Sequence, residues 1–243
     1  MSAYYKLYQN LLVIIRFQRR TKELGMQKQK IILLKSAWKK GWLPFLRQFI
    51  RSVRDTLFSK HHYIYSLDIS NMDYKDKSRF PDLKFRVIRN WEDLDAEVLA
   101  RLKDEQEYLG WGDFGWLTDL EYQLIVGEID GKIAGLGWLR NNQQAQDFFV
   151  PLPDNAELVW QTTVLPEYRG KKLFDKFLWQ LMIHRAQFGT TLFFINCRDY
   201  NTTTQSSLAR MGWSYLGYVA EYKRSGKRQM NLLKTPVPAQ EIL

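Results

Sequence analysis

The feature that most constrains the fold is an alternation between two hydrophobic periods, which begins at Leu83 and runs almost to the end of the chain. Segments in which every second residue is apolar predict strands, and segments with apolar residues three and four apart predict helices. The expected strands are 83–88, 123–129, 133–140, 157–164, 191–197, 214–224 and 227–233, and the expected helices are 91–109, 171–187 and 201–210. This order predicts an α/β (α+β) fold with a mixed central sheet and helices on both faces.

Turn residues separate these segments where a sheet of this kind needs them. Asp130-Gly131 predicts a tight hairpin between the second and third strands, and Ser225-Gly226 predicts one between the last two. Gly110 and Gly189 each follow a helical segment and predict its end.

Charge divides the chain into two parts. Residues 1–60 contain 14 lysines and arginines but only Glu23 and Asp55 as acids, whereas the whole chain has a net charge of +10. Apolar residues recur at helical spacing in this part, with basic residues on the opposite face. We therefore expect a basic amphipathic helical extension at 1–60, a short strand and linker at 61–81, a main domain at 82–235 and a tail at 236–243.

The basic extension has two open interpretations. Its helices pack on the main domain and keep a solvated basic face, or they dock onto an anionic partner. A membrane surface fits the stripes of Trp, Phe and aliphatic residues, and these stripes disfavour nucleic acid. The longest apolar run there, from Leu11 to Ile15, is far too short to span a membrane.

Cysteine and histidine are scarce. The single cysteine, Cys197, excludes an internal disulfide and fits a reducing, cytoplasmic compartment. Peripheral attachment to the inner membrane surface is the alternative location. His61, His62 and His184 do not have the spacing of zinc ligands, so we expect no metal site.

The segment with the clearest chemistry is Pro-Glu-Tyr-Arg-Gly-Lys-Lys at 166–172, between a strand and a helix. Free backbone N–H groups and the helix dipole bind phosphate at such a helix start. Gly170 allows the backbone to approach a ligand closely, and Arg169, Lys171 and Lys172 add positive charge. The segment therefore predicts a phosphate-binding turn, with a purely structural basic turn as the alternative.

Residues 164–171 also resemble the acyl-CoA signature of the GNAT acetyltransferase superfamily. A second match follows at Asn201, Thr204, Leu208, Gly212 and Trp213, which fit the family's Asn-x2-Ser-x3-Leu-x3-Gly-Phe segment. The resemblance covers 82–235 and implies a GNAT fold and transfer of an acetyl group from acetyl-CoA to a primary amine.

The resemblance also implies which residues hold the CoA donor. They are Thr163, Val164, Arg169, Gly170, Lys171, Lys172, Leu173 and Asn201. The sequence departs from the family at Lys172, where a second glycine is usual, and at Leu208, where many members have a tyrosine.

Acyl transfer needs a polarised thioester, a neutral amine and a stabilised leaving thiolate. Backbone N–H groups of residues 161–164 can polarise the thioester. Glu157 is the candidate base, or else an exposed strand-end carboxylate. Thr204 is the candidate partner of the leaving sulfur, or else an ordinary first-turn threonine.

The acceptor and the acyl chain length stay open. Trp111, Asp113 and Trp116 lie in an aromatic and glycine-rich segment where GNAT-like folds shape the acceptor pocket, although an ordinary packed loop has the same composition. Alternative functions are transfer of a longer acyl group from acyl-CoA or from an acidic acyl carrier protein, and action at a membrane surface on a lipid-linked or envelope-sugar amine.

Overall fold

The structure is a computed structural model that describes residues 34–35, 37–39, 41–70, 72, 82–88, 93–109, 123–170 and 172–242. These residues fall into two compact units. One unit holds the residues up to Lys60 together with 103–109 and 221–227, and the other holds the remaining described residues. The second unit contains most of the sheet and all of the candidate site described below.

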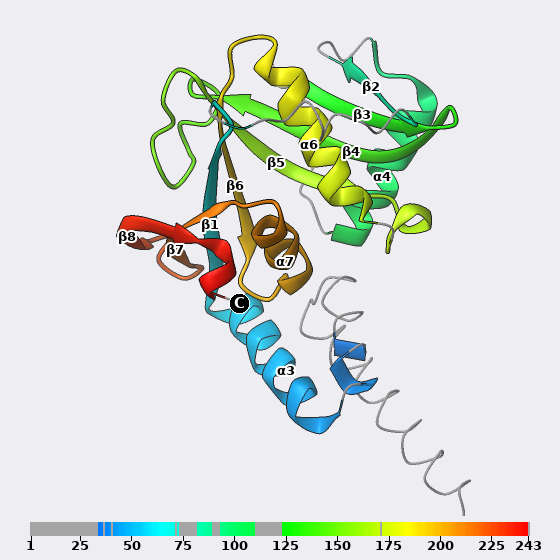
Figure 1. The fold of residues 1–243 in the computed structure, drawn as a ribbon. Coiled ribbons are helices and arrows are strands. Elements are labelled where there is room, and N and C mark those ends of the chain that lie inside the picture. The colour runs from blue at the N-terminus through cyan, green and yellow to red at the C-terminus, as the bar shows by residue number, and fades with distance from the viewer. Residues whose placement is uncertain are drawn as a thin grey trace, which may run out of the picture. The chain divides into compact units, whose positions relative to one another are not determined.

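Eight strands form one mixed sheet in the order β2-β3-β4-β5-β6-β1-β7-β8 (Figure 1). They are β1 (Ser59–Asp68), β2 (Leu83–Ile88), β3 (Gln123–Ile129), β4 (Lys132–Asn141), β5 (Ala156–Val164), β6 (Leu192–Arg198), β7 (Ser214–Tyr222) and β8 (Arg228–Pro238). β5 and β6 pair in parallel, whereas β2–β3, β3–β4, β4–β5 and β1–β6 are antiparallel. The predicted α/β class with a mixed central sheet is confirmed.

The helices predicted at 171–187 and 201–210 agree with the structure to within two residues, whereas the α-helix predicted at 91–109 begins at Ala96. The helices are α3 (Trp42–Leu57), α4 (Ala96–Leu109), α6 (Leu173–Ala186) and α7 (Thr202–Arg210), with short 3-10 turns η3 (Pro166–Tyr168) and η4 (Ala239–Ile242). After α6, Gly189 donates to the carbonyl of Ala186 and Thr190 to that of Arg185, which closes the helix as expected. Gly110 lies outside the described residues. Within the described ranges, no helix is long and apolar enough to cross a membrane.

Strand β1 comes from the segment that the sequence places before the main domain. It lies inside the sheet between β6 and β7, and pairs with β6 from His62 opposite Arg198 to Asp68 opposite Leu192. Tyr65 in the middle of β1 is fully buried. The short strand expected in 61–81 is therefore a ten-residue strand, and the sheet begins N-terminal to residue 82.

Helix α6 packs closely on one face of the sheet because three glycines leave room for a single ring. Phe177 of α6 is fully buried over Gly127 of β3 and over Gly135 and Gly137 of β4. A Cβ atom on Gly127 would lie 2.5 Å from Cε2 of Phe177, inside van der Waals contact. Phe85 of β2 meets the same ring edge-on, with centroids 5.3 Å apart. These contacts fix the position of α6, and hence of its first turn, above the sheet.

The opposite face of the sheet carries the segment between β4 and β5. Ala145 and Phe148 of this segment pack on Leu158 of β5 and Phe194 of β6. Arg140, which is buried at the end of β4, donates from Nε to the carbonyl of Gln144 at 3.1 Å and ion-pairs with Asp147. The segment between β4 and β5 is therefore held in place by both apolar and polar contacts.

Candidate functional site

The candidate site begins where two parallel strands separate. β5 pairs with β6 only over Ala156–Val159, opposite Leu192–Ile195. Beyond that point β5 stays with β4 up to Val164, while β6 stays with β1 up to Arg198. Figure 1 shows the two strands diverging. Each strand therefore turns an edge of backbone groups towards a gap in the middle of the sheet.

A bulge marks the point of divergence. Leu136 faces Thr163 and Trp138 faces Trp160, so two residues of β5, Gln161 and Thr162, oppose Gly137 alone. Gln161 has a positive φ of 45°, which L residues seldom adopt. Bulges of this kind bend a strand and change the direction of its side chains and N–H groups.

The bulge brings Thr162 so near to β4 that only glycine fits opposite. A Cβ atom on Gly137 would lie 2.8 Å from Oγ1 of Thr162. Gln161 Oε1 and Thr162 Oγ1 are two of the twelve buried side-chain atoms, within the described residues, that have no hydrogen-bond partner. Unpaired buried polar atoms are costly, and they are typical of ligand sites.

The last residues of β5 offer a backbone donor to the gap. Leu165 donates its N–H to the carbonyl of Ala134 in β4 at 2.9 Å. Because N–H groups alternate sides along a strand, the N–H of Val164 points away from β4, towards the edge that β6 has left. Thr163, the neighbouring residue, is buried on the face of the strand.

The chain then turns from β5 into α6. Gly170 has a φ of +83°, and a Cβ atom built there would meet no atom within 4 Å, so its surroundings are open. The hydrogen bond from Lys176 N–H to the carbonyl of Lys172 is the first of the helix. The N–H groups of residues 173–175 therefore have no carbonyl acceptor within the helix, and a helix start of this kind can bind an anion.

The backbone conformation at Lys172 explains why a glycine is usual at this position in the GNAT signature. Lys172 is the N-cap of α6 and lies in the left-handed region, with φ 55° and ψ 24°. This conformation costs an L residue about 1–2 kcal/mol, and glycine adopts it freely. The departure noted in the sequence is thus accommodated with the backbone that a glycine would have. Lys171 lies outside the described residues.

Charged side chains around the turn are held by partners. Arg169 donates from Nε to the carbonyl of Val164 at 2.8 Å, which ties the turn to the end of β5. Asp175 in the first turn of α6 ion-pairs with Arg210 of α7 at 3.0 Å. A bare carboxylate there would repel an anion at the helix start, and the arginine offsets this repulsion.

Glu157, the predicted base, lies in the half of β5 that is paired with β6. It is 7% exposed, and both of its carboxylate oxygens accept hydrogen bonds from Nε of Arg185 in α6, at 2.9 and 3.0 Å. The ion pair joins β5 to the last turn of α6. The catalytic role of Glu157 stays a prediction.

Asn201 and Thr204 lie together after the end of β6. Asn201 is the N-cap of α7, and its Oδ1 accepts the backbone N–H of Thr204 at 3.3 Å. Gln205 donates to the carbonyls of Arg198 and Asp199 and fixes the start of α7 against the end of β6. The backbone of Thr204 is therefore fixed in the first turn of α7, directly after the end of β6. Trp111, Asp113 and Trp116 lie outside the described residues.

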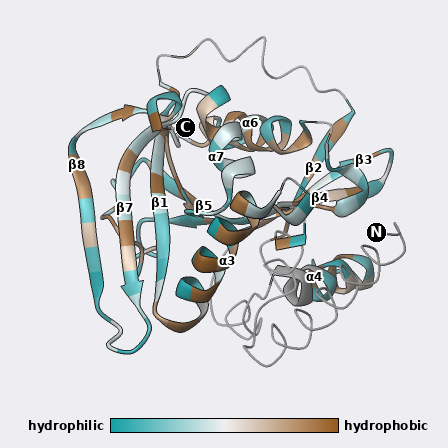
Figure 2. Cartoon of the chain, turned by 90° about the horizontal axis from the view of Figure 1, so that it is seen from below, coloured by the Kyte–Doolittle hydropathy of each residue, from teal (hydrophilic) through white to brown (hydrophobic). Residues whose placement is uncertain are grey.

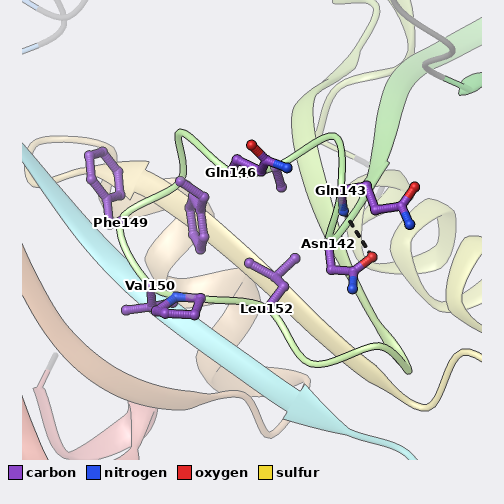
Figure 3. Close-up of a pocket in the computed structure, with 9 residues that line it drawn as sticks. Asn142, Gln143, Gln146, Phe149, Val150 and Leu152 are labelled. Atoms are coloured by element: carbon purple, nitrogen blue, oxygen red, sulfur yellow. Dashed lines mark hydrogen bonds between the residues drawn. The ribbon is translucent and has the colours of Figure 1, made fainter.

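A pocket in the segment between β4 and β5 was not predicted from the sequence. Residues from 142 to 152 line a pocket of about 480 Å³, in which Asn142 and Gln143 lie on one side and Phe149 on the other (Figure 3). The ring of Phe149 lies 4.9 Å from that of His62 and 5.3 Å from the guanidinium of Arg228. Irregular segments without a hydrophobic period carry little signal for such a pocket.

Two further kinds of reactive group are metal-binding clusters and the cysteine thiol. In the described part of the chain, no group of three His, Cys, Asp or Glu side chains could hold a metal ion. Cys197 is buried on the α6 side of β6, and burial raises the pKa of its thiol to about 12. The thiol is therefore protonated at neutral pH.

Comparisons with known proteins were made with the sequence and with the fold. No protein-family model matches the chain, and no curated protein matches it. Similar solved structures include a GNAT-family acetyltransferase from Colwellia psychrerythraea, with 17% identity, a TM-score of 0.48, and coverage of 72% of this chain and 57% of that one. A protein from Novosphingobium aromaticivorans described as a GNAT-family acetyltransferase has 15% identity, a TM-score of 0.45, and coverage of 67% and 62%.

A functionally unknown protein from Staphylococcus epidermidis has 11% identity, a TM-score of 0.42, and coverage of 70% of this chain and 63% of that one. The chain thus spans about three fifths of the length of these three proteins, by the printed coverages of 57%, 62% and 63%. The order of strands, the divergence of β5 from β6 and the glycine turn into α6 agree with the fold that the sequence resemblance implies.

Proposed function

We propose that this protein is an N-acyltransferase that uses an acyl-CoA donor, most simply acetyl-CoA, and a primary amine acceptor. One observation carries the proposal: the gap between β5 and β6 and the anion-binding start of α6 lie at the same end of β5. An elongated ligand with a diphosphate at one end and a reactive carbonyl at the other fits this arrangement. Acyl-CoA is such a ligand.

The donor would bind along β5. Its diphosphate would accept hydrogen bonds from the N–H groups that begin α6 at Leu173, beside Gly170 and Lys172, with Arg169 and Lys171 adding positive charge. Its pantetheine arm would follow the edge at Thr163 and Val164 and pass Asn201. The thioester carbonyl would then lie near the bulge at Gln161, where backbone N–H groups can stabilise the developing oxyanion.

The chemistry is direct transfer. A neutral amine attacks the thioester carbonyl, the C–N bond forms, the C–S bond breaks, and the CoA thiolate leaves. The amine loses a proton, with Glu157 as the candidate acceptor, and the thiolate gains a proton or a hydrogen bond, with Thr204 as the candidate donor. Trp111, Asp113 and Trp116 are the candidate residues of the acceptor pocket. An acyl-CoA donor also favours a cytoplasmic location.

The donor site is tested by isothermal titration of the full chain with acetyl-CoA and with a longer acyl-CoA. A matched pair of variants isolates the site, because Gly170 and Gly189 flank the two ends of α6 with φ of +83° and +91° and both face open space. Gly170→Ala and Gly189→Ala therefore impose similar backbone strain. We expect Gly170→Ala to weaken binding about tenfold or more through the lost close approach, and Gly189→Ala to leave binding unchanged.

The outcomes separate the alternatives. Saturable binding of acetyl-CoA that is lost only in Gly170→Ala supports the proposal. Binding of the longer donor alone moves the function to long-chain transfer. If neither donor binds, or if Gly189→Ala weakens binding as much as Gly170→Ala does, the proposed CoA site is wrong, and an acyl carrier protein becomes the donor to test.

A further inference from the structure

Helix α3 has an aromatic end and a strongly amphipathic surface. It begins directly after Gly41, and Trp42, Phe45 and Phe49 form a chain of ring contacts with Trp38, with centroids 5.0–6.2 Å apart. Trp42 is nevertheless 64% exposed. Trp is enriched where protein meets the headgroup region of a bilayer, because its ring is amphipathic.

An exposed apolar row runs along α3. Leu43, Ile50 and Leu57 are seven residues apart, which places them above one another on one side of a helix. Their exposed fractions are 57%, 58% and 48%. The row spans 14 residues, or about 21 Å at the rise of an α-helix. Three large aliphatic side chains exposed in line form a patch, unlike the scattered single residues of an ordinary surface.

Basic side chains border this row. Arg47 lies one turn after Leu43, and Arg51 lies one turn after Arg47; both are exposed. Asp55, the acidic residue of α3, is fully buried, so the exposed charged side chains of this helix are basic. Figure 2 shows hydrophobic and hydrophilic residues alternating along α3.

We propose that α3 is a membrane-docking helix that lies in the plane of an anionic lipid surface. The row of Leu43, Ile50 and Leu57 enters the boundary of the acyl chains, Trp42 lies at headgroup level, and Arg47 and Arg51 contact lipid phosphates. Charge complementarity identifies the partner, since residues 1–60 carry 14 cations and two acids. This docking does not depend on the acyl donor, so the two proposals can fail separately.

Flotation of the full chain with lipid vesicles tests the proposal. Vesicles of phosphatidylcholine with phosphatidylglycerol are compared with vesicles of phosphatidylcholine alone, at low and high salt. We expect flotation with the anionic vesicles that weakens as salt rises. Replacing Leu43, Ile50 and Leu57 by serine should reduce membrane partitioning about tenfold or more, and Arg47→Glu and Arg51→Glu should each reduce it about fivefold or more.

Control variants use exposed residues of β8 with the same chemistry. Leu232→Ser with Leu233→Ser, and Lys234→Glu, should leave flotation unchanged, since these exposed side chains lie on strand β8 and not on the amphipathic helix α3. Circular dichroism and thermal melting confirm that each variant is folded. Absence of flotation at low salt overturns the proposal. Unchanged flotation of the folded triple-serine variant, or equal binding to neutral vesicles, also overturns it. So does self-association of the chain through Leu43, Ile50 and Leu57, because the exposed row would then be a contact between two copies.

Discussion

The two halves of β5 differ in what surrounds their backbone. From Ala156 to Val159 the strand is hydrogen-bonded on both edges, to β4 and to β6, and its one charged side chain, Glu157, is neutralised by Arg185. From Trp160 to Val164 one edge has no strand beside it, the register shifts at a bulge, and two buried polar side-chain atoms have no partner.

The second half of β5 therefore lacks stabilising interactions that the first half has. A strand that leaves its neighbour loses ladder hydrogen bonds, and a buried polar group without a partner costs further free energy. Such losses persist when the surrounding structure holds the backbone in place, and they cluster at binding sites. The first half of β5 is therefore the support, and the second half is the candidate site.

The largest expected effect comes from breaking the support. Arg185→Met should lower the free energy of unfolding by about 3–5 kcal/mol, because it leaves Glu157 buried without its partner. Urea denaturation measures the change. The double variant Glu157→Leu with Arg185→Met should recover most of the loss, since it removes both charges.

The same ion pair separates a structural role of Glu157 from a catalytic one. If Glu157 only supports α6, Glu157→Gln lowers stability, and turnover falls only as far as the folded fraction or donor affinity falls. A folded Glu157→Gln variant that binds donor normally but has lost turnover would instead support its role as the base. A cost below about 1 kcal/mol for Arg185→Met would contradict the supporting role of the pair.

The next effect comes from filling the space opposite the bulge. Gly137→Ala should destabilise the protein by about 1–3 kcal/mol, because its Cβ atom would lie 2.8 Å from Thr162 Oγ1. Adding Thr162→Ala should restore part of the loss, which chemical denaturation of the two variants can establish. Gly137→Ala should also weaken donor binding if the bulge positions the thioester. Equal costs with and without Thr162→Ala would show that the contact with Phe177, at 3.3 Å, is the limiting one.

A smaller effect is expected at the turn beyond the open half of β5. Lys172→Gly removes the strain of a left-handed lysine but adds the backbone entropy of glycine, so we expect a gain in stability of about 0.5–1 kcal/mol. Thermal unfolding measures it. Donor binding by Lys172→Gly and by the unchanged protein is then compared at low and at high salt. If the variant binds more weakly at low salt alone, the Lys172 charge has a long-range electrostatic role. A loss of stability would mean that the lysine side chain makes contacts that outweigh the strain.

The sequence predicted the support better than the site. The spacing of hydrophobic residues predicted the bounds of β5 and α6 to within two residues, because burial on one face imposes a pattern that many residues share. The bulge at Gln161 depends on one unusual dihedral angle, and nothing in a glutamine signals it. The ion pair of Glu157 with Arg185 joins residues 28 apart, and a charge at a strand start looks the same whether it is solvated or buried.

Family resemblance and residue pattern also failed to place β1. Its sequence reads as a strand, but the choice of its neighbours depends on contacts with β6 and β7, which are more than a hundred residues away in the chain. By contrast, the turn at Gly170 was predictable, because a strand, a glycine and a helix must follow one another locally. Local geometry is readable from sequence here, and pairing across long separations is not.

The smallest expected effect is on the β6 side of the gap, at Cys197. Burial raises the pKa of its thiol to about 12 from an ordinary value of 9.0, so the reactive thiolate is scarce. Labelling of native protein by a thiol reagent should be slow at pH 7 and should still be slow at pH 9, where an exposed cysteine reacts fully. The folded state holds the proton more tightly than the unfolded state, so the stability that the neutral thiol contributes is present below pH 9 and is lost as pH rises towards 12. Fast labelling at pH 7 that is suppressed by bound acyl-CoA would show that the gap reaches Cys197. The candidate site would then include β6 as well as the second half of β5.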